Sequence, residues 1–163
     1  MNKILFSLVF VFFSFPTYVY AQNSQEDLRA LVQKVDSLEH ELSYLKLSYD
    51  LQTLNYDINM FANEVYARSI AIELSFRHQN FDSRLGDMYQ GYYEACQSKK
   101  ESLEGLIDVR KKYFILRTMT YPYSKTELST LKASYDVIDD AYDALESSMD
   151  LLKVILDAYL EAL

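Results

Sequence analysis

The fold is decided by residues 28–65, which read LRALVQKVDSLEHELSYLKLSYDLQTLNYDINMFANEV. Apolar residues recur in this stretch at alternating spacings of three and four, which is the pattern of α-helices that pack along one side. Two such stripes are present. The first stripe consists of Leu28, Leu31, Val35, Leu38, Leu42, Leu45 and Tyr49, and the second of Leu47, Leu51, Leu54, Ile58, Phe61, Val65 and Ile72.

The second stripe is offset from the first by two residues, and two residues rotate a helix by about 200°. We expect one long helix over about residues 25–76, and its apolar side therefore changes near residue 47. Because the two stripes face in opposite directions, a single partner surface cannot cover both of them.

The remainder of the chain is also helical in character, with only two prolines and three glycines in 163 residues. A second helix is expected from Ser83 or Asp87 to Arg117. A third helix begins after the capping box formed by Ser124 and Glu127 and carries a heptad seam as far as its end. Turns near residues 81 and 121 predict an all-α fold of three long helices in an antiparallel three-helix bundle.

The lengths of these helices predict how the chain is divided. Folding back near residue 81 brings Arg117 close to residue 45, so earlier residues have no helix of their own chain to contact. We therefore expect residues 47–163 to form the bundle and residues 22–46 to project as an N-terminal coiled-coil extension. Residues 1–21 have the pattern of a signal peptide, because Lys3 precedes an apolar run of about a dozen residues, shorter than a membrane span.

The first stripe follows a heptad repeat with Leu28 at position a and Leu31 at position d. In a parallel two-stranded coil, Lys34 at g meets Glu39 at e of the partner, and Glu41 meets Lys46 in the same way; both pairs attract. The sequence therefore predicts self-association as a parallel dimer. Docking on a different helical protein and a loose tail are the alternatives.

Few other residues are candidates for a functional site. Tyr121 and Tyr123 lie in the expected turn, where their rings either form an exposed contact tip or cover the end of the bundle. Cys96 is the only cysteine, and it is either a buried core residue or the site of an intermolecular disulfide. His40 falls at heptad position f and is expected to face solvent. Six acids and no base lie between Lys132 and Lys153, which is typical of a solvated helix face and only weakly of a cation site.

The composition limits the function further. The formal net charge is −8, which argues against binding to nucleic acid and to anionic membranes. The sequence contains no catalytic, phosphate-binding or cysteine–histidine metal motif, so we expect no enzymatic activity, cofactor or metal. The prediction is a periplasmic or secreted helical scaffold protein that self-associates through its coiled coil. A periplasmic holdase-type chaperone for unfolded clients is the second hypothesis, and a cation-binding helical protein is the third.

Overall fold

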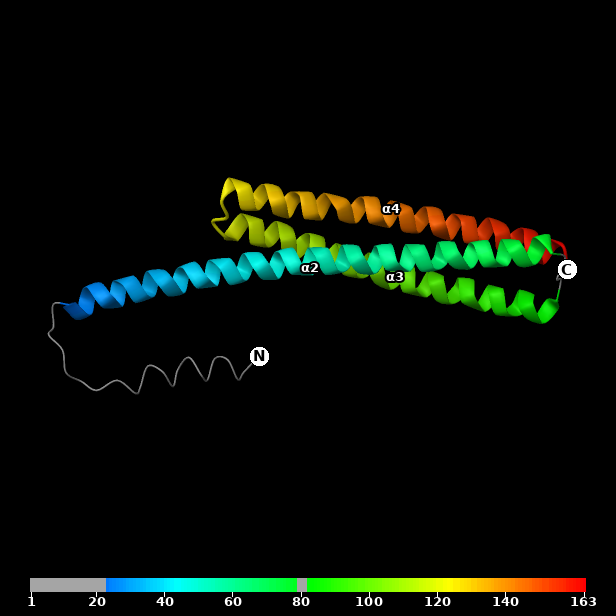
Figure 1. The fold of residues 1–163 in the computed structure, drawn as a ribbon, viewed down its shortest axis with the longest axis horizontal. Helices are drawn as coiled ribbons and strands as arrows, with labels where there is room; N and C mark the ends of the chain where they lie inside the picture. The colour runs from blue at the N-terminus through cyan, green and yellow to red at the C-terminus, as the bar shows by residue number, and fades with distance from the viewer. Residues whose placement is uncertain (1–22, 79–81) are drawn as a thin grey trace, which may run out of the picture. The chain divides into compact units, whose positions relative to one another are not determined.

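The computed structural model describes residues 23–78 and 82–163, and in this part of the chain it contains three long α-helices and no β-strand (Figure 1). These helices are α2 (Asn23–Arg77), α3 (Ser83–Thr120) and α4 (Lys125–Glu161). The all-α class and the three long helices predicted from the sequence are confirmed. The expected signal peptide, residues 1–21, lies outside the described residues.

The chain divides into two compact units, Met1–Glu39 and His40–Leu163. In the first unit, residues 23–39 form the beginning of α2. The second unit, which we call the bundle unit, contains the rest of α2 together with α3 and α4 (Figure 1). The bundle unit starts ahead of Leu47, the first residue of the second stripe, because residues between His40 and Leu47 also pack against the other helices.

Ion pairs between helices give the directions of the three helices. Lys99 and Arg110 of α3 lie next to Glu64 and Asp50 of α2, so a later residue of α3 pairs with an earlier residue of α2. The same order holds between α3 and α4. Lys100 pairs with Glu146, and the later residue Lys111 pairs with the earlier residue Asp139. The bundle is therefore antiparallel at both turns, as the short connections require.

The core of the bundle is formed mainly by α2 and α4. All seven residues of the second stripe of α2 are buried, from Leu47 to Ile72. The seam predicted for α4 is buried over most of its length, and only its last residue, Leu163, is largely exposed. α3 contributes less to the core: Cys96 and Ile107 are buried, whereas Met88 and Leu106 are exposed, although their spacing from Cys96 and Ile107 predicts a place in the packing stripe of this helix.

The helix ends follow from local side-chain chemistry. Asp82 caps α3, because its carboxylate accepts a 2.8 Å hydrogen bond from the backbone N–H of Arg84. The predicted capping box of α4 is confirmed. The Ser124 hydroxyl accepts from the Glu127 N–H at 3.2 Å, and the Glu127 carboxylate accepts from the Ser124 N–H at 2.8 Å.

One of the three glycines permits a close approach between helices. A Cβ atom on Gly86 would lie 2.7 Å from Leu163 Cδ1 and 3.2 Å from Leu160 Cδ2, whereas a Cβ on Gly91 would meet nothing within 4 Å. The start of α3 therefore packs closely against the end of α4, and Gly86 is the residue that allows it.

Candidate interaction site

The residues of the expected coiled-coil seam are exposed along its whole length. Their exposed fractions range from 38% at Val35 to 69% at Tyr49. Four of them lie in the first unit and three in the bundle unit. Val32, which is not part of the first stripe, is also exposed and occupies position e beside the seam. We define the seam by the residues Leu28, Leu31, Val35, Leu38, Leu42, Leu45 and Tyr49.

This exposure has a thermodynamic consequence. Removing apolar surface from water is favourable by about 25 cal/mol per Å², and a row of leucines on one side of a helix gathers that surface into a single strip. The charged residues that flank the seam, Lys34, Glu39, Glu41 and Lys46, are exposed as well. The strip and its charged borders can therefore meet another helix.

The turn between α3 and α4 is packed against the part of α2 that follows Glu39. Tyr123 is only 7% exposed, and its hydroxyl lies 2.9 Å from the hydroxyl of the buried Ser43. The ring of Tyr123 also makes an edge contact with Tyr44, and it stacks on Tyr121 with 5.7 Å between the ring centroids. Of the two alternatives for this turn, the structure has the one in which Tyr123 covers the end of the bundle, while Tyr121 stays partly exposed.

His40 lies in the same cluster. The prediction that its side chain faces solvent is wrong, because the ring is directed at Glu127 and Tyr123. Its Nε2 atom is 3.1 Å and 3.3 Å from the two carboxylate oxygens of Glu127, and its ring centroid is 5.5 Å from that of Tyr123. The sequence contained a signal for this position. Continued backwards at the same spacing, the buried stripe that starts at Leu47 passes through Tyr44 and His40.

The carboxylate of Glu127 serves two partners. Hydrogen bonds from Ser124 hold the pKa of Glu127 below its usual value, and the neighbouring His40 contributes in the same direction. One side chain therefore both caps α4 and connects α4 to α2. The arrangement is a structural link, because its hydrogen-bonding groups are directed at one another.

The cations of α3 reach acids on both neighbouring helices. Folding back near residue 121 predicts that Lys99 and Lys100 lie opposite the region of Asp140 and Asp143, and that Arg110 lies near Lys132. The structure gives these cations other partners. Lys100 pairs with Glu146 at 2.8 Å, Lys111 pairs with Asp139, Lys99 lies 3.7 Å from Glu64, and Arg110 lies 2.7 Å from Asp50.

Two of these pairs, Lys100–Glu146 and Lys111–Asp139, join α3 to α4. Hydrogen bonding to Glu146 raises the pKa of Lys100. Partial burial, together with a hydrogen bond to Glu104, raises the pKa of Tyr142 to about 12. Two acids of α4, Asp139 and Glu146, are therefore engaged by lysines. Among the described residues, no group of three or more histidine, cysteine or acidic side chains is arranged to hold a metal ion.

Cys96 lies on α3 and is only 3% exposed. Burial raises the pKa of its thiol, which disfavours the reactive thiolate. The structure therefore places Cys96 in the core, the first of the two alternatives. A disulfide to another chain would require this part of the bundle to open.

An apolar groove is present between the ends of α2 and α4, with a volume of about 350 Å³. Most of its lining is aliphatic or aromatic, and the charged pair at its edge belongs to α2. The side chain of Val154 is 66% exposed there. The lining residues are Glu73, Phe76, Arg77, Leu151, Val154, Ile155 and Ala158.

No protein-family model, curated protein or solved structure matches this chain. Within the described ranges, none of the helices is both long enough and apolar enough to cross a membrane. Any function must therefore be inferred from the surfaces described above.

Proposed function

We propose that this chain is an exported, non-catalytic scaffold protein that associates with a second copy of itself through the seam from Leu28 to Tyr49. The observation that carries the proposal is the exposure of all seven seam residues in the single chain. A heptad seam of this kind is stable in water when a partner helix covers it. The bundle would then be the part of the protein that is presented by the dimer.

The flanking charges support a parallel arrangement. In a parallel coil, each g residue lies near the e residue five positions later in the partner chain. Lys34 would then face Glu39 of the second copy, and Glu41 would face Lys46. In an antiparallel coil g residues face g residues and e residues face e residues, so a Lys34–Glu41 contact and a Glu39–Lys46 contact would need two different registers, whereas one parallel register makes both of its pairs.

The first experiment compares two leucines with matched exposure. Leu38 of the seam is 56% exposed and Leu116 of α3 is 59% exposed. We expect the purified protein to be a dimer by light scattering and Leu38→Lys to be a monomer, because two lysines would face each other inside the coil. Leu116→Lys should remain dimeric. A monomeric parent protein, or identical masses for the two variants, would refute self-association through the seam.

The second experiment tests the orientation by charge reversal. Lys34→Glu turns one attractive g–e contact into a repulsive one in each half of a parallel dimer, and should raise the dimer dissociation constant several-fold. The double variant Lys34→Glu/Glu39→Lys restores the attraction and should recover the affinity. If Glu39→Lys does not rescue Lys34→Glu, the parallel register is wrong. Both variants should be measured at low salt, because salt screens the attraction between exposed charges.

Export is supported by the sequence pattern of residues 1–21 alone. We expect mass spectrometry of the protein recovered from the periplasm or the medium to give a chain that begins at Gln22. Recovery of the protein with Met1 to Ala21 still attached would contradict cleavage at this position.

A holdase is the second candidate, and the apolar groove between α2 and α4 favours it. An unfolded client segment would place apolar side chains against Phe76 and Val154. The test is suppression of the aggregation of reduced insulin, with Val154→Glu compared with Val109→Glu, an equally exposed valine of α3 outside the groove (66% and 61%). Loss of suppression in the groove variant alone would support the holdase; no suppression by the parent protein would refute it.

A further inference from the structure

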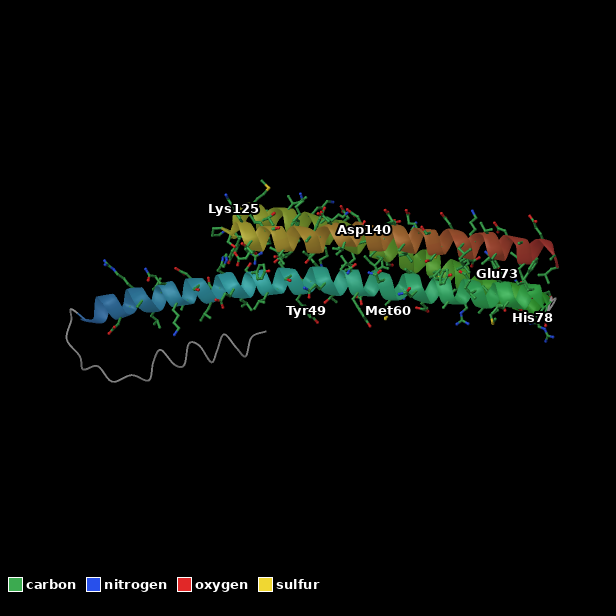
Figure 2. All side chains as sticks on the ribbon, turned by 45° about the horizontal axis from the view of Figure 1, so that its top comes forward. Tyr49, Met60, Glu73, His78, Lys125 and Asp140 are labelled. Atoms are coloured by element: carbon green, nitrogen blue, oxygen red, sulfur yellow. The ribbon has the colours of Figure 1, made fainter. Side chains whose placement is uncertain are left out.

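α2 carries a second exposed stripe after the seam ends. We call it the outer stripe and define it as Tyr49, Gln52, Tyr56, Met60, Asn63 and Tyr66, all of them exposed. Their spacings of three and four residues place them on one side of the helix. Figure 2 shows the labelled Tyr49 and Met60 on the side of α2 that is directed away from Lys125 and Asp140 of α4.

The outer stripe continues the heptad phase of the seam. Tyr49, Tyr56 and Asn63 occupy successive a positions, and Gln52 occupies a d position. Met60 lies at position e, next to the d position of Asn59, and Tyr66 is again at position d. The buried residues of this part of α2 occupy positions c and f, on the opposite side, except for Ala62 at position g. α2 therefore has two usable sides over this length, one of which its own bundle covers.

The outer stripe contains no charged residue, although a quarter of the chain is charged. Two acids of α2 from the same span are directed to α3, where Asp50 pairs with Arg110 and Glu64 with Lys99. The exposed apolar residues of α3 do not form such a surface, because the ion pair between Asp108 and Lys112 lies among them. Depletion of charge together with tyrosine and methionine is typical of the centre of a protein–protein interface.

We infer that the outer stripe is a continuation of the dimer interface and that its occupant is the same stripe of a second copy. The inference rests on the proposed function, since the seam provides the parallel alignment. A parallel two-fold axis places each residue opposite its own counterpart, so any charge on the axis would face a like charge. An uncharged stripe avoids that cost, and the amides of Gln52 and Asn63 can hydrogen bond to their counterparts. An asparagine at position a also favours two strands in register.

The exposed area of the outer stripe is large enough to extend the seam interface but too small to form a stable interface by itself. An aromatic side chain buries about 150–250 Å², and the rings of Tyr49, Tyr56 and Tyr66 are each half to two-thirds exposed, so they supply roughly 300–450 Å² per copy. A stable interface needs about 800 Å² per partner. The seam must supply the remainder, so the two surfaces are expected to act together.

Cross-linking at single positions tests the inference directly. Each variant is made in the full chain with Cys96→Ser, and oxidised glutathione supplies the oxidant. Cysteines can bridge only when their Cα atoms lie within about 7 Å, so a symmetric link reports residues that face each other across the two-fold axis. The three positions are Leu38→Cys in the seam, Tyr56→Cys in the outer stripe, and Val109→Cys on α3 as the control, which has nearly the exposure of Tyr56 (61% and 65%).

We expect the Leu38→Cys and Tyr56→Cys chains to form covalent dimers and the Val109→Cys chain to stay monomeric on a denaturing gel. Linking at residue 38 but not at residue 56 would overturn the inference and leave the proposed function standing. Linking at neither position would overturn both. Linking of the control as fast as the Tyr56→Cys chain would show random collision, which also overturns the inference.

A charge substitution tests the stripe with Cys96 in place. Tyr56→Lys puts two lysines on the two-fold axis, and we expect the dimer dissociation constant to rise at least tenfold in sedimentation equilibrium. Val109→Lys places the same charge on α3 and should leave the dissociation constant unchanged. Equal dissociation constants for the two variants would show that the second copy does not extend over the outer stripe.

Discussion

The hydrogen bond between Ser43 and Tyr123 allows a quantitative test of how the turn is attached to α2. The two hydroxyl oxygens are 2.9 Å apart, both residues are buried, and 80 residues separate them in the chain. Replacing either residue leaves the other hydroxyl buried without this partner, which costs about 1–3 kcal/mol of unfolding free energy. Tyr123→Phe belongs at the lower end, because the Ser43 hydroxyl can turn to the carbonyl of the preceding helical turn.

The double variant Ser43→Ala/Tyr123→Phe removes both hydroxyl groups and leaves neither one unsatisfied. We expect it to be more stable than the sum of the single changes indicates, by about 1 kcal/mol. Alanine also raises the helix propensity at residue 43 by about 0.5 kcal/mol, but this gain is present in the single and the double variant and cancels from the cycle. An exposed replacement, Ser98→Ala, measures that gain separately.

The assay is urea unfolding followed by circular dichroism at 222 nm, with all four proteins at one concentration because the proposed dimerisation would raise apparent stability. For a slope of about 2 kcal/mol per molar urea, a coupling of 1 kcal/mol corresponds to a midpoint difference of about 0.5 M. A coupling below about 0.3 kcal/mol would mean that the single effects simply add, and Tyr123 would then not be attached to α2 through its hydroxyl.

Three further predictions concern single sites. Gly91→Ala should raise the unfolding free energy by about 1 kcal/mol, because alanine favours the helix and its Cβ meets nothing; Gly86→Ala should gain less, since Leu163 must move, and an equal gain would contradict the close approach. Cys96 should react with iodoacetamide at least tenfold more slowly in the folded protein than in urea at the same pH, because burial raises its pKa; equal rates would place the thiol at the surface. Glu127→Gln should destabilise the protein at neutral pH and progressively less as the pH falls below the unfolded carboxyl range, because a lowered pKa gives stability only while the group is ionised; a constant difference in urea midpoint across that range would refute this.

The parts of the fold that could be predicted are the ones with a uniform repeat. The buried side of α2 from Leu47 onwards and the seam of α4 each keep one spacing and one packing side, so periodicity alone located them. α3 could not be predicted in the same way. It makes contacts with two helices, and the antiparallel alignment fixes which residues are level but not how the helix is rotated about its axis. Arg110 was therefore assigned to the level of Lys132, whereas it is turned towards Asp50.

The candidate site shows the same limit. Exposure of the seam follows from the change of apolar side near residue 47, and the sequence contains that change. The packing of Tyr123 on Ser43 does not follow, because it depends on how a four-residue turn folds against a helix far away in the sequence. The backward extension of the buried stripe indicates the position of His40, but the heptad of the first stripe places His40 at position f, which predicts a solvent-facing side chain.

The separation of the two sides of α2 affects how the protein tolerates change. Ile58 is buried in the core of its own chain. Tyr56, two positions away, is exposed and takes no part in that core. Substitutions on the exposed side of α2 can therefore change what this helix binds without disturbing the core that each chain builds by itself.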